Sequence, residues 1–273
     1  MRREGTGLRP QDLDKGNEPV IDPDQLYTAL LWLIIGVSAV SFPCLFFFTA
    51  PYGRHKGKGS GPGMNATLGW LIMELPPPIV FALVYWHGEN RAELVPLILL
   101  AIWEAHYFYR SFVFPLLLSV RGKQKPIMAV VVGFLFNMIN AFLNAYAITN
   151  LAPHLSESWL ADPRFWLGAI SMGVGFAICF HSDRVLRLLR KPGETGYEIP
   201  RGGFYRWVSS PNYLGEIIEW GGWAMITWTT AGLSFFLFSF ANLFPRAFSH
   251  HRWYRETFED YPEDRKAILP GLL

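Results

Sequence analysis

Long runs of apolar residues constrain this chain more than any other feature. A helix needs about 20 residues to cross the hydrocarbon core of a membrane, and stretches of about that length recur along the 273 residues. They cover residues 26–50, 66–86, 94–118, 127–148, 166–186, 212–229 and 230–248. The last two adjoin at 229–232, so six spans with one re-entrant segment form the alternative. The pattern predicts an all-α integral membrane protein with seven transmembrane helices.

Composition agrees with this class. Hydrophobic residues make up 51% of the chain and charged residues 17%, whereas about a quarter of a soluble domain is charged. The net charge of +2 is too small to indicate a nucleic-acid partner. Residues 1–25 are polar and lack the early apolar core of a signal peptide. We therefore expect a polar segment over 1–25 and one membrane domain over 26–273.

The distribution of basic residues predicts the orientation. Short cytoplasmic loops carry an excess of Lys and Arg. With seven spans, most of the 24 Lys and Arg residues lie on the side opposite to the amino terminus. The amino terminus should therefore lie outside the cytosol or in a lumen, and the carboxy terminus in the cytosol.

A few polar residues fall inside the predicted spans, where they are costly and often functional. Glu74 lies about 12 Å from the cytosolic end of its helix, and Tyr107 and Arg110 lie at similar depth on the next one. Glu74 precedes three prolines that must break the helix. For Glu74 the alternative is a structural hydrogen bond to a neighbouring helix, and for Tyr107 it is an ordinary aromatic-rich span. Asn137, Asn140 and Asn144 share one helix face and could equally join helices or line a site.

The segment 181–266 holds the densest polar signal. It combines many basic residues with Asp183, Tyr197, Asn212 and Glu216. Arginines suit phosphates, and carboxylates or amides suit ribose hydroxyls, so the mixture favours a nucleotide over lipid headgroups. The nucleotide-binding loops should cover about 184–211 and 246–270. No histidine or cysteine spacing fits a metal site, so no metal is expected.

These segments resemble the steroid 5α-reductase family, the NADPH-dependent 3-oxo-5α-steroid 4-dehydrogenases. The resemblance rests on residues 181–220 and 246–270, and extends upstream to MELP (73–76), HYFYRSFVFPLL (106–117) and NAFLNAY (140–146). It implies a seven-helix reductase that binds NADPH from the cytosol and takes its steroid from the bilayer.

The resemblance also implies roles for individual residues. Glu74 and Tyr107 correspond to the pair that contacts the 3-keto oxygen of the steroid. The implied cofactor positions are Arg110, Arg121, Asp183, Arg190, Tyr197, Asn212, Glu216, Arg246, His250 and Tyr254. We expect the steroid cavity to include Trp70, Met73, Phe136 and Trp220. Met73 stands where Gln is expected and Cys179 where Asn is expected, which affects substrate fit and one cofactor contact.

The implied chemistry agrees with the depth of the polar residues. Hydride addition to an enone places negative charge on the ketone oxygen, and hydrogen-bond donors aimed at that oxygen stabilise it. Tyr107 can donate its phenolic hydrogen, and a desolvated Glu74 should stay protonated and donate as well. Arg110 opposes this by favouring the ionised form of Glu74.

Two other functions are compatible with the sequence. One is a membrane methyltransferase of the isoprenylcysteine type that uses S-adenosylmethionine, and the other is a sterol-binding protein without catalysis. For the reductase we expect a monomer among membrane lipids, in the endoplasmic reticulum if eukaryotic and in the inner membrane if bacterial.

Overall fold

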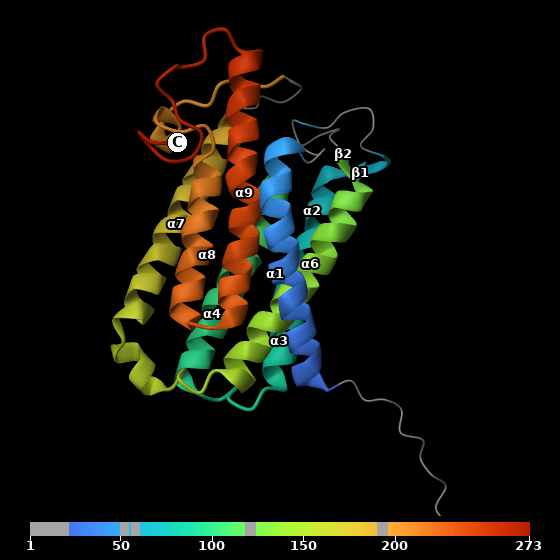
Figure 1. Ribbon diagram of the computed structural model, residues 1–273, viewed down its shortest axis with the longest axis vertical. Helices are drawn as coiled ribbons and strands as arrows, with labels where there is room; N and C mark the ends of the chain where they lie inside the picture. The colour runs from blue at the N-terminus through green and yellow to red at the C-terminus, as the bar shows by residue number, and fades with distance from the viewer. Residues whose placement is uncertain (1–21, 50–54, 56–60, 118–123, 190–195) are drawn as a thin grey trace, which may run out of the picture.

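The long helices of the chain lie side by side in an elongated bundle (Figure 1). The computed structural model describes residues 22–49, 55, 61–117, 124–189 and 196–273. The first helix begins at one end of the bundle and the carboxy terminus lies at the other. The principal helices are α1 (Pro23–Phe47), α2 (Ala66–Glu74), α3 (Pro76–Trp86), α4 (Leu94–Phe108), α5 (Phe114–Leu117), α6 (Ile127–Tyr146), α7 (Pro163–Leu188), α8 (Pro211–Thr227) and α9 (Thr230–Thr257).

Short elements complete the fold. They are the π-helical segments η2 (Tyr109–Val113) and η3 (Ala147–Leu151), the 3₁₀ segments η4 (Glu157–Ala161) and η5 (Gly203–Arg206), and the antiparallel strands β1 (Gly63–Asn65) and β2 (Gln124–Pro126). The strands pair Met64 with Lys125 and bring the starts of α2 and α6 together. The helical class predicted from the sequence is confirmed.

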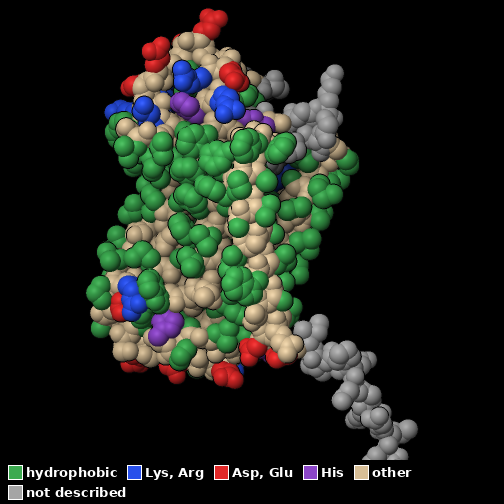
Figure 2. Space-filling model, in the orientation of Figure 1, with side chains coloured by type: hydrophobic (Ala, Val, Ile, Leu, Met, Phe, Trp, Pro, Cys, Tyr) green, Lys and Arg blue, Asp and Glu red, His purple; other side chains and the backbone are tan. Residues whose placement is uncertain are grey.

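Five helical segments among the described residues are long and apolar enough to cross a membrane. They are Pro23–Phe47, Ala66–Trp86, Ile127–Leu151, Pro163–Leu188 and Thr230–Thr257. The other two predicted spans also form helices in the bundle: α4 continues through η2 into α5, and α8 has 17 residues. Figure 2 shows a broad hydrophobic belt with charged side chains at both ends. The count of seven crossings stays a prediction.

Several helix ends differ from the predicted ones for identifiable reasons. α1 begins at Pro23 because Asp22 caps it, accepting a hydrogen bond from the backbone of Asp24. α9 continues to Thr257, so the predicted loop at 246–270 is helical over its first half. The apolar run ends earlier, but Tyr254 still buries its ring against Tyr261 and keeps the last turns packed. Likewise α7 extends to Leu188, into the loop predicted from 184.

α7 and α8 are the most closely packed helices of the bundle. Gly168 on α7 faces Gly222 on α8, and Gly175 faces Gly215. On each helix the two glycines are seven residues apart in sequence. A Cβ atom at Gly222 would lie 2.5 Å from the backbone nitrogen of Met172. Only glycine allows this contact between backbones, as at small-residue interfaces in membranes. The turn to α9 follows directly, at Trp228, which adopts a left-handed conformation. α8 and α9 are thus separate antiparallel helices.

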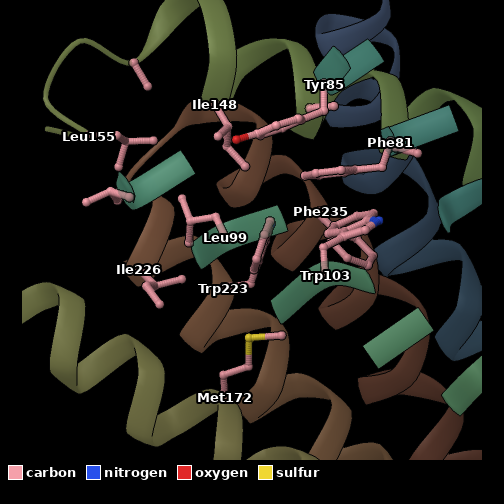
Figure 3. Close-up of a cluster of buried hydrophobic side chains, with 14 of the residues drawn as sticks. Phe81, Tyr85, Leu99, Trp103, Ile148, Leu155, Met172, Trp223, Ile226 and Phe235 are labelled. Carbon is pink, nitrogen blue, oxygen red and sulfur yellow. The ribbon is translucent and has the colours of Figure 1, made fainter. Parts of the chain in front are cut away.

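The main hydrophobic core surrounds Trp103 on α4. Its ring lies 4.6 Å from that of Phe81 and 5.1 Å from that of Trp223, and Figure 3 shows these side chains meeting from different helices. The indole of Trp223 donates to Asn144, which in turn donates to Asn140. Of these two asparagines, Asn144 therefore joins α6 to α8, while Asn140 holds it from within α6.

Candidate active site

A cavity of about 200 Å³ lies between α2, α4, α6, α7, α8 and α9. Most predicted site residues of the membrane segments line it: Met73, Glu74, Tyr107, Arg110, Phe136, Asp183, Glu216 and Trp220. Asn137 lines it as well, unlike Asn140 and Asn144. The structure thus brings together residues from widely separated parts of the chain, including the proposed pair Glu74 and Tyr107.

Glu74 is positioned by a break in its helix. Pro77 and Pro78 lack backbone N–H groups, so the carbonyls of Met73 and Glu74 have no donor one turn ahead. The side-chain amide of Asn137 donates to the Met73 carbonyl at 2.7 Å, and the hydroxyl of Ser111 donates to the Glu74 carbonyl. Neighbouring helices thus satisfy the freed backbone groups, as a hydrocarbon environment requires.

Tyr107 lies in an aromatic wall of the cavity and is only 3% exposed. Its ring centroid is 4.7 Å from that of Trp103. On another side it stacks with Trp220, with centroids 6.1 Å apart and planes 24° from parallel. These contacts leave the ring little freedom, so its hydroxyl group has a defined position relative to the cavity.

A second buried polar pair borders the same cavity and was not predicted. Nδ1 of His106 lies 2.6 Å from Oε1 of Glu219, and both side chains are buried. The His106 ring also packs edge-on against Trp220, with centroids 4.6 Å apart. The sequence signal was present, because His106 opens the HYFYR motif and Glu219 follows Glu216 on the same helix.

Arg110 connects three helices at the cavity wall. Its guanidinium lies 3.3 Å from Glu216 on α8 and 3.7 Å from Asp183 on α7. The guanidinium also lies 4.9 Å from the centroids of Trp70 and Phe114, a cation–π arrangement. Trp70, predicted to bind the steroid, therefore contacts Arg110 instead of lining the cavity.

Cys179 and Lys125 adjoin the site. The Cys179 sulfur is 3.8 Å from Glu216 and 3.9 Å from Asp183. Lys125, just outside the spans, donates to the Met73 sulfur at 3.3 Å and lies 4.3 Å over the Trp70 ring. Burial lowers the pKa of Lys125 to about 8, while nearby Glu74 acts in the opposite direction.

The remaining predicted cofactor residues lie nearer the carboxy-terminal end. Arg246 on α9 is buried and donates to the Tyr213 hydroxyl at 3.1 Å. One turn further, the His250 ring lies 5.2 Å from that of His55. Tyr254 stacks on Tyr261, Tyr197 packs edge-on against Trp253, and Asn212 interacts with Asp183. Arg121 and Arg190 lie outside the described residues.

This chain is similar in sequence to a protein family and to several of its members. Its residues 123–273 match the family described as 3-oxo-5-alpha-steroid 4-dehydrogenase. The chain is 41% identical to 3-oxo-5-alpha-steroid 4-dehydrogenase 1 of Bos taurus over 252 residues, which is 91% of this chain and 97% of the relative. It is 38% identical to steroid 5-alpha-reductase DET2 of Solanum lycopersicum, over 91% of this chain and 98% of the relative.

The chain belongs to the steroid 5-alpha-reductase family. The human member named 3-oxo-5-alpha-steroid 4-dehydrogenase 1 is 36% identical, again over 91% of this chain. These alignments span most of the sequence, so they reach beyond the carboxy-terminal half that the family description covers. The chain is therefore an enzyme of the oxidoreductase class and a multi-pass membrane protein. The resemblance seen in the sequence is confirmed, and the comparisons do not support the methyltransferase alternative.

Proposed function

We propose that this steroid 5-alpha-reductase family member reduces the Δ4 double bond of 3-oxo-Δ4-steroids with NADPH, yielding 5α-dihydrosteroids. The observation that carries the proposal is the shared cavity of Glu74 and Tyr107, two polar side chains beside the apolar rings of Phe136 and Trp220. A flat molecule with one ketone matches such a site, since ligand pockets combine mostly apolar walls with a few polar groups. The names of the close relatives support the same substrate class.

The donor and acceptor set fits a dinucleotide. Asp183 and Glu216 place carboxylates at the cavity wall, where they can accept hydrogen bonds from amide or hydroxyl groups. Arg246 brings a buried guanidinium to the second half of α9, where a phosphate group would need a cation. Asn212, His250 and Tyr254 would add further polar contacts on the same side.

Within this proposal NADPH, when bound, supplies the hydride for the β-carbon of the enone. Tyr107 and a protonated Glu74 donate hydrogen bonds to the ketone oxygen and stabilise the negative charge that develops there. Trp103 and Trp220 fix the Tyr107 ring. Arg110 is paired with Asp183 and Glu216, whose carboxylates offset its charge beside the cavity.

The arrangement of the helices suggests how the enzyme sits in its membrane. We infer seven crossings, with α4–α5 and α8 added to the five long apolar helices. The carboxy-terminal end would then face the cytosol, because it carries the basic loops after α7 and α9. NADPH would bind from that side and the steroid would come from the bilayer.

The test is turnover by the purified protein in lipid nanodiscs. The protein is incubated with NADPH and a panel of Δ4-3-oxosteroids, and the products are identified by mass spectrometry and chromatography against 5α and 5β standards. We expect NADPH consumption matched by a 5α product. Steroid binding without NADPH consumption, or a 5β product, would contradict the proposal.

A further inference from the structure

A second pocket opens on the outside of the bundle between α4 and α7. It has a volume of about 400 Å³. Its outer rim consists of the small and apolar residues Ile102, Ala105, Ala169 and Gly173, and the buried Met172 lines it further in. We call this pocket the α4–α7 groove. It lies beside the cavity lined by Glu74 and Tyr107, which we call the reaction cavity.

The groove and the reaction cavity share one wall. His106, Phe176 and Glu219 line both spaces. They lie one residue before Tyr107, three residues before Cys179 and one residue before Trp220, all of which border the reaction cavity. A molecule in the groove is thus separated from the cavity of the proposed keto-binding pair by one layer of side chains.

The outer rim of the groove lies where lipid would surround the protein. Gly173 is the eleventh residue of α7, so it sits about 15 Å along that helix, near the middle of a membrane. Ala105 and Gly173 are exposed, and a Cβ atom at Gly173 would meet no other atom within 4 Å. Small side chains on two facing helices therefore keep the groove open.

The floor of the groove is chemically unlike its rim. The hydrogen-bonded pair His106 and Glu219 lies there, 2.6 Å apart. Ionisable groups at this depth are costly, and they usually mark a ligand or a path. An acyl chain matches the apolar rim but has no group for the floor. A steroid matches both, because its rings suit the rim and its ketone can contact the pair.

Another external groove provides a contrast. It lies between α7, α8 and α9, has a volume of about 660 Å³, and includes Gly221, Met225 and Phe236. None of its lining residues borders the reaction cavity, and none is ionisable. It offers lipid a site without a path inward.

We propose that the α4–α7 groove is the lateral route by which the steroid passes from the bilayer to the reaction cavity, with the His106–Glu219 pair at its inner end. The inference rests on the function proposed above. Since His106, Phe176 and Glu219 separate the two spaces, their side chains turn aside as the ketone passes. The pair offers the ketone hydrogen-bonding partners on the way to Tyr107 and Glu74.

The experiment fills the groove from its rim. Gly173→Leu and Gly173→Trp are assayed in nanodiscs beside the natural protein, with steroid and NADPH varied separately. We expect kcat/KM for the steroid to fall by about tenfold with tryptophan and less with leucine, mainly through KM, while NADPH affinity changes by less than about twofold. Gly36→Trp is the matched control, since Gly36 is also exposed on an apolar helix and its Cβ atom would meet nothing within 4 Å.

The possible outcomes are distinguishable. If the natural protein reduces no steroid, the proposed function is wrong. If it is active and Gly173→Trp behaves like Gly36→Trp, the route is elsewhere and the inference is overturned. A lower melting temperature with unchanged kcat/KM would show a structural lipid site instead. If Gly173→Trp does not fold, Ala105→Leu narrows the groove from α4 and must give the same rise in KM.

Discussion

The two sides of α7 use glycine in opposite ways. Toward α8, Gly168 and Gly175 let backbones touch, and a Cβ atom at either position would meet main-chain atoms. Toward α4, Gly173 faces open space at the rim of a groove. The α8 side of α7 therefore has no space for a side chain or a ligand, whereas the α4 side leaves room beside the reaction cavity. A rigid seam next to an accessible cavity is what precise positioning of a mobile apolar substrate requires.

The largest effect is expected on activity, from variants of Glu74 and Tyr107 in the reaction cavity. Tyr107→Phe and Glu74→Gln each remove or weaken one donor to the ketone oxygen, so we expect kcat to fall by roughly 10²–10³, the usual loss for one oxyanion donor. The measurement is steady-state kinetics with a Δ4-3-oxosteroid. NADPH affinity, measured in the same preparations, should stay near that of the natural protein. Nearly full activity in both variants would remove this pair from the mechanism.

The closed side should respond through stability. Gly175→Val forces side-chain atoms against the backbone of Glu219, and we expect a loss of about 1–3 kcal/mol, as for other overpacked sites. Gly173→Val, two residues away on the same helix, should change stability by less than about 0.5 kcal/mol. Thermal or denaturant unfolding in one detergent compares the two. Equal destabilisation would mean that the two sides of α7 do not differ in packing.

A smaller effect concerns Lys125, which lies on β2 just before α6. Burial lowers the pKa of Lys125 to about 8 from 10.5, so between these values the unfolded chain binds a proton that the folded one has lost. Stability should rise with pH across that window. Lys125→Met should remove this rise and raise stability at pH 7. Melting temperatures of both proteins from pH 7 to 10.5 provide the test, and parallel curves would contradict it.

The smallest effect is expected where α7 begins, away from both sides. Hydrogen bonds from the Arg164 side chain and backbone hold the pKa of Asp162 at about 2, below 3.8. The carboxylate therefore stabilises the fold above pH 3.8, and this contribution disappears as the pH falls through about 2. Asp162→Asn can still cap the helix, so its stability should lack the rise between these values and be only slightly lower above pH 3.8. A neutral-pH difference as large as that of Gly175→Val would be inconsistent with this.

The sequence predicted the helices well because their apolar runs are long and uninterrupted. The break before Pro76 followed from proline chemistry, and so did the placement of Glu74. Tyr254 could not be placed on α9 in this way, since polar residues end the apolar run while aromatic stacking continues the helix. Trp70 was assigned to the steroid because aromatic residues suit one, but the structure packs it against Arg110.

The His106–Glu219 pair shows a limit of a different kind. The two residues are 113 positions apart, and neither spacing nor periodicity connects them. Their pairing depends on how α4 packs beside α8 in the bundle. Polar residues in apolar helices could be recognised from sequence, but the choice of partner needed the packing.

The broken helix at Glu74 has a consequence for biogenesis. The backbone beside this carboxyl group is completed by Asn137 from α6 and Ser111 from η2, both of which are synthesised later. While the ribosome is still making the second span, the acid therefore has no fixed direction. If Glu74 acts as proposed above, its carboxyl group would gain a fixed direction only after η2 and α6 have docked beside it, so a chain truncated before α6 would be inactive.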